Sequence, residues 1–207
     1  MFEAAYRGLQ ALEPDRLMLD YGFCSLPFDS YHVTAFDVAN VADLDRCRDE
    51  VRGELKLSFD LLPSQEAFQA GFLKEALSSE IAAGEWNLAF GFGGLCILGS
   101  VMVALLSPLD LDAFGPFFEA RGRLSREYEE RYGVRAPEFF MPHLSLGYFL
   151  NHEGAELASK QIGEWDVVFQ EFAGEASLSF SRVSLYGFTD MATFFRETEG
   201  VHPGLMR

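Results

Sequence analysis

The feature that most constrains the fold is a long stretch without any charged side chain, residues 86–109. A segment of this length could cross a bilayer. Four glycines interrupt it, however, and both flanks are acidic, with no excess of Lys or Arg on one side to orient a membrane span. We therefore predict two buried strands, 88–92 and 95–106, joined at Gly93-Gly94, and no membrane span.

Charge narrows the classes of partner. The 207-residue chain has 32 Asp and Glu against 16 Lys and Arg, a net charge of -16. Such a surface repels polyphosphate, so a protein that coats long nucleic acid is not expected, and a nucleic-acid-derived substrate would have to be short or held in a local pocket. With 49% hydrophobic residues and no low-complexity linker, residues 1–207 should form a single domain.

The cysteines and the N-terminal residues bear on location. Cys24, Cys47 and Cys96 form no CxxC pair, and their odd number does not suggest a disulfide framework. The first residues lack a basic start followed by an apolar run. We therefore expect a protein of the reducing cytoplasm.

Hydrophobic periodicity predicts helices and strands that alternate along the chain. Helices are expected over residues 2–12, 41–55, 64–84, 153–163, and from Asp110 or Asp112 to Gly133. Further strands are expected over residues 31–38, 54–62, 139–150, 167–172 and 177–188. The elements fall into two roughly similar rounds, and each round contains one strand with a histidine.

Those two strands carry the same triplet, a histidine followed two residues later by a hydroxyl: His32 with Thr34, and His143 with Ser145. Alternate residues of a strand point to one face, so each strand should present an imidazole and a hydroxyl together. Two histidines can act as general base and general acid, and two hydroxyls can hydrogen-bond the nonbridging oxygens of a phosphate. One such triplet is most often a core histidine, but the pair in matching apolar contexts favours phosphodiester cleavage without a metal.

Residues 30–38 (SYHVTAFDV) and 141–149 (MPHLSLGYF) resemble the paired signature motifs of the 2H phosphoesterase superfamily, which includes bacterial RNA 2′,5′-ligase-like proteins and cyclic nucleotide phosphodiesterases. The resemblance implies an α+β fold of two pseudo-symmetric lobes, each an antiparallel sheet with outer helices, around a central groove. Relatives usually open with a strand, which residues 16–22 would have to supply here.

The resemblance also implies catalytic roles for His32 and His143, phosphate binding by Thr34 and Ser145, and no cofactor. We hypothesise that His143 activates the attacking water and His32 protonates the leaving alkoxide, although the two roles could be exchanged. Thr34 and Ser145 would stabilise the charge that develops on the phosphate oxygens.

Further substrate contacts are suggested by strand parity. Phe36 and Phe149 would share faces with the histidines of their own triplets and could stack on a base, with core packing as the ordinary alternative. Tyr148 would point away unless a bulge intervenes. Arg182, expected on the last strand, could contact a further phosphate or be a solvated edge residue. The arginines of residues 121–131 alternate with glutamates, which predicts an exposed helix face.

Two other classes of site were weighed. Neither His32 nor His143 has Asp, Glu or Cys at regular ligand spacing, so we expect no metal. The competing function is a groove that binds a nucleotide or phosphorylated ligand without turnover. Within the enzyme class the sequence leaves open a small cyclic phosphodiester or a short RNA end as the substrate, and it leaves the oligomeric state open.

Overall fold

The computed structural model describes residues 1–134, 139–190, 192–196 and 200–201. The chain has an α+β fold, as expected, with one sheet of five strands and one of three. It divides into two compact units. The first unit contains residues 1–34, 88–110 and 141–179, and the second contains residues 35–87 and 111–140 with the described part of 180–207.

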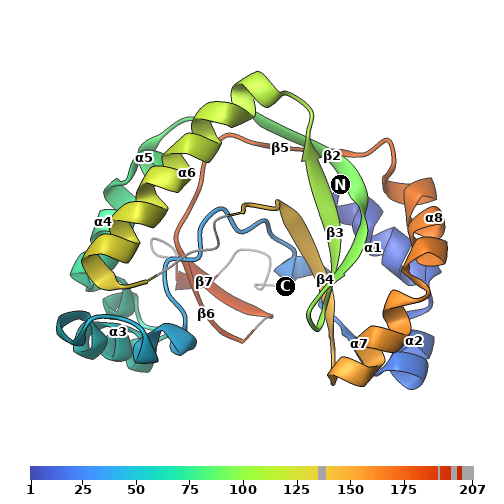
Figure 1. The fold of residues 1–207 in the computed structure, drawn as a ribbon, viewed down its shortest axis with the longest axis horizontal. Helices are drawn as coiled ribbons and strands as arrows, with labels where there is room; N and C mark the ends of the chain where they lie inside the picture. Colours follow the sequence, from blue (N-terminus) through green and yellow to red (C-terminus); the bar gives the residue numbers. More distant parts are fainter. Residues whose placement is uncertain (135–138, 191, 197–199, 202–207) are drawn as a thin grey trace. The chain divides into compact units, whose positions relative to one another are not determined.

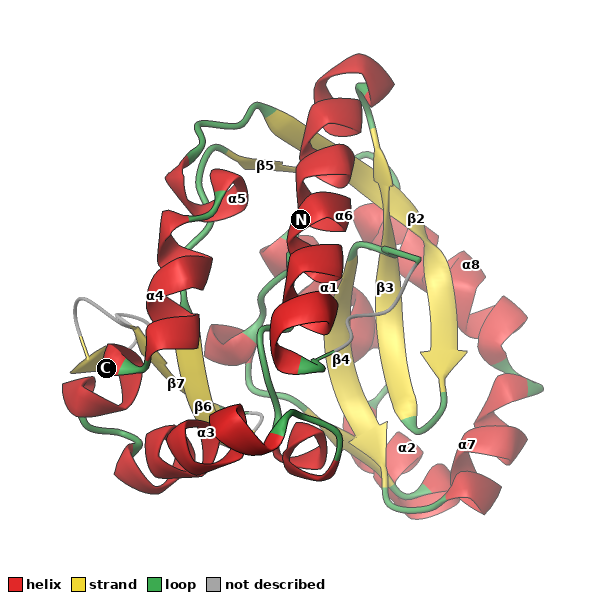
Figure 2. Cartoon of the chain, turned by 60° about the vertical axis from the view of Figure 1, so that its left-hand side comes forward, coloured by secondary structure: helices red, strands yellow, loops and turns green. Residues whose placement is uncertain are grey.

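The first unit is built on a curled five-stranded sheet (Figure 1). In spatial order its strands are β1 (Phe23–Ser25), β4 (His143–Phe149), β3 (Val101–Pro108), β2 (Leu88–Leu98) and β5 (Ser177–Phe180). The pairs β1·β4, β4·β3 and β3·β2 are antiparallel. Figure 2 shows β2, β3 and β4 side by side. The central strands contain no Asp, Glu, Lys or Arg, which allows both of their faces to be covered.

The charge-free stretch forms the β2–β3 hairpin at the centre of this sheet. Its turn is not at Gly93-Gly94, as predicted, but at Gly99, whose φ of +62° lies in the left-handed region that glycine adopts readily. Gly93 is instead a bulge inside β2, because Phe92 pairs with Leu106 while Gly94 pairs with Leu105. Within the described residues, no helix is long and apolar enough to cross a membrane.

The helices of the first unit lie along one side of its sheet (Figure 1). They are α1 (Phe2–Ala11), α2 (Pro14–Tyr21), α7 (His152–Ser159) and α8 (Ile162–Ala173). Phe169 of α8 packs on Phe92 of β2 with ring centroids 5.3 Å apart. Gly8 allows α1 to approach this contact, since a Cβ there would lie 2.8 Å from the Phe169 ring. The Asp166 carboxylate accepts a hydrogen bond from Leu95 N at 2.6 Å, which ties α8 to β2.

Two expected strands in this unit are helical. Residues 16–22 lie mostly in α2, and β1 at 23–25 supplies the edge strand instead. Residues 167–172 belong to α8, in which Phe169 and Ala173 are fully buried four positions apart while Val167 is 66% exposed. Burial at i and i+4 is the pattern of a helix packed on one side, and it outweighs the β-branched character of this short run.

The second unit combines helices with a small sheet. Its described elements are η2 (Val41–Asp45), α3 (Asp49–Leu61), η3 (Gln65–Gln69), α4 (Gly71–Ser78), α5 (Glu80–Ala83), α6 (Leu111–Tyr132), β6 (Tyr186–Asp190), β7 (Thr193–Arg196) and β8 (Gly200–Val201). Helix α6 is joined to α4 by the Tyr128 hydroxyl, which donates to the Phe72 carbonyl. Phe195 of β7 packs on Phe68 of η3. The predicted strand over 54–62 is wrong, because these residues continue α3.

Candidate functional site

The second triplet lies where sequence analysis placed it, on β4. His143 is the first residue of this strand and pairs with Leu105 of β3, and Ser145 pairs with Val103. Both side chains are half-buried on one face of the sheet. The His143 Nδ1 donates a hydrogen bond to the Met141 carbonyl at 2.7 Å. A carbonyl can only accept, so Nδ1 carries a proton and Nε2 is the ring atom through which a proton is exchanged.

The first triplet is not in a strand. Pairing between β1 and β4 continues to Leu26, whose N–H donates to the Leu146 carbonyl at 2.8 Å. Pro27 follows, has no N–H to extend the ladder, and is succeeded by the single turn η1 (Phe28–Ser30). Residues 31–38 then run on without pairing to another strand. The predicted strand over 31–38 is therefore wrong.

His32 nevertheless repeats the local geometry of His143. Its Nδ1 donates to the carbonyl of Ser30, also two residues earlier, at 2.8 Å. Its ring is half-buried, and Thr34 is exposed. The turn that holds Ser30 is closed by the Ser30 hydroxyl, which donates to the Pro27 carbonyl at 2.7 Å. Both triplets belong to the first unit, in which Thr34 is the last residue of its segment.

A bulge in β4 changes which aromatic side chain lies beside the second triplet. Val103 pairs with Ser145 but Met102 pairs with Gly147, so Leu146 is an extra residue and strand parity reverses after it. The expectation that Phe149 shares a face with His143 is therefore wrong. Phe149 is 5% exposed and packs on Phe23, on the opposite side of the sheet.

Tyr148 takes that position on the His143 face. It pairs with Val101 of β3, which lies on the same face as Val103. Burial raises the pKa of the Tyr148 phenol, and a hydrogen bond with the Ser145 side chain acts in the opposite direction. Sequence analysis did not include Tyr148 among the site residues. The available signal was Gly147, since an isolated glycine inside an apolar strand often marks a bulge.

Phe36 and Arg121 are packed together in the second unit, directly after the first triplet. The Phe36 ring meets Tyr128 edge-on at 5.6 Å. Arg121 is 5% exposed, so the expected exposed face is wrong for this residue. Its Nε donates to the Ala35 carbonyl at 3.0 Å, and its guanidinium lies 4.8 Å from the centroid of Phe140. Burial lowers the pKa of Arg121. Arg121 thus fixes the backbone that follows Thr34.

Arg182 lies in a loop between β5 and β6, so the single strand predicted over 177–188 is interrupted at this residue and forms two strands. It forms an ion pair with Glu85 at 2.8 Å, and both side chains are more than two-thirds exposed, at 73% and 79%. Exposed pairs of this kind contribute little to stability. The proposed phosphate contact of Arg182 stays a prediction.

Within the described residues, no group of three or more His, Cys, Asp or Glu side chains is placed to hold a metal ion. Comparisons of the chain with protein-family models, with curated proteins and with solved structures each found no match. The likeness to the 2H phosphoesterases is therefore carried by residues 30–38 and 141–149 alone.

Proposed function

We propose that this chain is a metal-independent phosphodiesterase of the 2H type, acting on a small cyclic phosphodiester or a short RNA end. The observation that carries the proposal is the repeated local geometry of His32 and His143. In both, Nδ1 donates to the carbonyl two residues earlier, and a hydroxyl side chain follows two residues later. A histidine that only filled space in the core would not need either feature twice.

The repeated bond fits general acid–base chemistry. Nδ1 carries a proton in the neutral ring and in the imidazolium, so the bond to the carbonyl holds the ring in place through a full proton cycle. Nε2 of His143 would take a proton from the attacking water, whose oxygen bonds to phosphorus. Nε2 of His32, as imidazolium, would give its proton to the leaving alkoxide as the P–O bond breaks. The two roles could be exchanged.

The hydroxyl groups would bind the phosphate. Thr34 and Ser145 would donate to the nonbridging oxygens and stabilise the charge that develops on them. Tyr148 lies on the same face of the sheet as Ser145, so a hydrogen bond between the two side chains would restrict the directions in which the Ser145 hydroxyl can point. The strands of the first unit contain no Lys or Arg, so the hydroxyl groups are the phosphate-binding donors that these strands can offer beside the histidine.

The proposal includes two finer statements. The first is the bilobal, pseudo-symmetric arrangement around a groove that the motif resemblance implies. The second is a cytoplasmic location, which is supported by the three unpaired thiols of Cys24, Cys47 and Cys96.

The test is hydrolysis of 2′,3′-cyclic nucleotides and of short oligonucleotides ending in a cyclic phosphate, measured with EDTA present. We expect turnover in EDTA and a loss of about 10²- to 10⁴-fold in kcat for His32→Ala and for His143→Ala. His152→Ala is the matched control, because His152 is an exposed helix residue outside both triplets and should retain full activity.

Three outcomes would overturn the proposal. Full activity in both single histidine variants would remove the acid–base assignment. Binding of the nucleotide without any product would identify a non-catalytic binding protein instead. Activity that disappears on chelation and returns with a divalent metal would identify a metal phosphodiesterase.

A further inference from the structure

One edge of the first unit's sheet is formed by β1, the first strand in the order β1-β4-β3-β2-β5. Two backbone bonds fix its register on β4. Leu150 N donates to the Gly22 carbonyl at 2.9 Å, and Leu26 N donates to the Leu146 carbonyl at 2.8 Å. In an antiparallel pair, the residues that bond across to the partner alternate with residues whose N–H and C=O point the other way. Residues 22, 24 and 26 therefore direct their backbone N–H and C=O groups toward β4.

Phe23 and Ser25 consequently direct their N–H and C=O groups away from β4, toward the outside of the sheet. The described strand order places no further strand on that side. An edge of this kind is a template for backbone pairing with an added strand. Natural edges are often protected by short length, by charged side chains or by proline. β1 is short, with three residues, but Phe23, Cys24 and Ser25 include neither a charged residue nor a proline.

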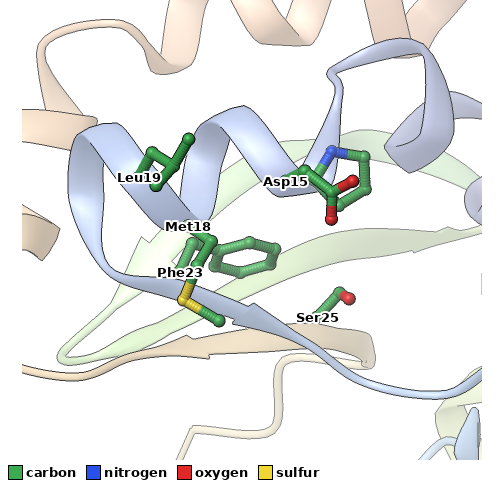
Figure 3. Close-up of a pocket in the computed structure, with 6 residues that line it drawn as sticks. Asp15, Met18, Leu19, Phe23 and Ser25 are labelled. Carbon is green, nitrogen blue, oxygen red and sulfur yellow. The ribbon is translucent and has the colours of Figure 1, made fainter.

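A pocket of about 330 Å³ opens beside this edge, between β1 and α2 (Figure 3). It is lined by Pro14, Asp15, Met18, Leu19, Phe23 and Ser25. Two of its apolar side chains are open to solvent, Met18 at 43% exposure and Leu19 at 85%. The pocket can thus accept an apolar side chain from a segment that runs along β1.

Charge around the pocket identifies the kind of segment that fits. Asp15 is its one charged lining residue. The nearby cation, Arg16, lies between two carboxylates, 3.7 Å from Glu13 and 3.4 Å from Asp20. The first unit as a whole has twelve Asp and Glu against three Lys and Arg. This surface attracts basic polypeptides and repels acidic ones, including a second copy of this chain.

We propose that β1 and the pocket beside it bind an extended basic segment of another protein by strand addition. The backbone of the segment pairs with the N–H and C=O of Phe23 and Ser25. One apolar side chain enters the pocket against Met18 and Leu19, and a Lys or Arg two residues along the segment, on the same face of the added strand, faces Asp15. The inference is independent of the phosphodiesterase proposal, because none of these residues belongs to either triplet.

The probe is a capped seven-residue peptide in which threonine at every odd position alternates with lysine, valine and lysine, so that the valine and the two lysines share one face. It is compared with two twins of the same charge, one N-methylated on its threonine amides and the other on its lysine and valine amides. Only one set of amides can face β1 in an added strand. We expect the parent peptide and one twin to bind by calorimetry and the other twin to fail. We also expect hydrogen exchange at the Phe23 and Ser25 amides to slow by about tenfold or more with the parent peptide.

Variants of the protein separate backbone pairing from general charge attraction. Ser25→Pro removes an outward N–H that the β1–β4 ladder does not use and should abolish binding, whereas Ser25→Ala should not. Leu19→Asn removes the apolar contact without changing the charge and should weaken binding. Its matched control is Leu111→Asn, at an exposed leucine of the second unit. Circular dichroism confirms that each variant is folded.

Equal binding of the parent and both twins would overturn the proposal, as would unchanged binding by folded Ser25→Pro. Failure of every peptide to bind would overturn it as well. If the protein alone forms a dimer that Ser25→Pro dissociates, the occupant is a second copy of this chain and the proposed partner is wrong.

Discussion

Gly147→Ala should be the most damaging single methyl group that can be added near the candidate site. A Cβ at this position would lie 2.6 Å from Phe23 Cε2, and closer still to Phe23 Cζ and to the Cys24 carbonyl oxygen. Moving either neighbour costs free energy. Phe23 is 1% exposed and packs against Phe149, and the Cys24 carbonyl belongs to the β1–β4 ladder.

The cost follows from what must shift. Overpacking a core by one methyl group costs about 1–3 kcal/mol, and each ladder bond that is lost adds about 0.5–1.5 kcal/mol. Because a carbonyl oxygen and a fully buried ring are both displaced, we expect the free energy of unfolding to fall by about 3 kcal/mol. For a chain of this length, that corresponds to a Tm lower by about 6–12 °C.

Thermal and urea unfolding followed by circular dichroism would measure this loss. The matched control is Gly163→Ala in α8, because a Cβ there meets nothing within 4 Å and alanine is the better helix former. Gly163→Ala should leave stability unchanged or raise it slightly. A Gly147→Ala variant within about 0.5 kcal/mol of the wild type would contradict the close packing of β1 on β4.

Four further substitutions test other parts of the structure. The Tyr31 hydroxyl is buried without a hydrogen-bond partner among the described residues, so Tyr31→Phe should raise the free energy of unfolding by about 1 kcal/mol. Tyr128→Phe loses the hydrogen bond to the Phe72 carbonyl and should lower the free energy of unfolding by about 1–2 kcal/mol. Burial raises the pKa of both phenols, so both tyrosines ionise at lower pH in the unfolded chain, and the free energy of unfolding should fall above about pH 10. In urea unfolding at high pH, each Phe variant should show a smaller fall than the wild type. An equal fall would contradict the raised pKa of that tyrosine. Arg121→Met should cost about 2 kcal/mol in the same assay, because the Ala35 carbonyl loses its donor, while the exposed Arg182→Met should cost almost nothing. Tyr148→Phe should lower kcat for a cyclic phosphodiester about 3- to 10-fold at unchanged KM, and should have no effect in a Ser145→Ala background.

Long periodic segments and the apolar centre of the sheet could be predicted from sequence. The observed bounds of α6 lie within two residues of the predicted helix, and β4 lies inside the predicted strand over 139–150 but begins four residues later. Short apolar runs were not predictable. Residues 54–62 alternate like a strand, yet Leu55 is 1% exposed and Leu57 is 57% exposed on one face and the other of α3. Which face is buried is decided by distant partners, so local periodicity cannot settle such runs.

The candidate site divides in the same way. That His143 and Ser145 share a face follows from strand parity, and the structure confirms it. The reversal of parity at Leu146 could not be predicted with assurance, because it depends on how Met102 and Val103 of another strand pair with β4. The state of residues 31–38 was missed because Pro27 and η1 divert the chain after β1. The local sequence identifies the histidine and hydroxyl groups of the candidate site. The pairing between distant strands decides which side chains lie next to them.

The acidity of the first unit gives the two proposals opposite salt dependences. The unit carries twelve acidic against three basic side chains, and its strands contain no Asp, Glu, Lys or Arg. A phosphodiester would therefore be held by short-range donors against a repulsive field, and added salt, by screening that field, should strengthen its binding. A basic segment at β1 is drawn in by the same field, so added salt should weaken its binding. An anion site built on several Lys or Arg side chains would weaken with salt, and that result for the phosphodiester would contradict a site of hydroxyls and imidazoles whose only cation is one imidazolium.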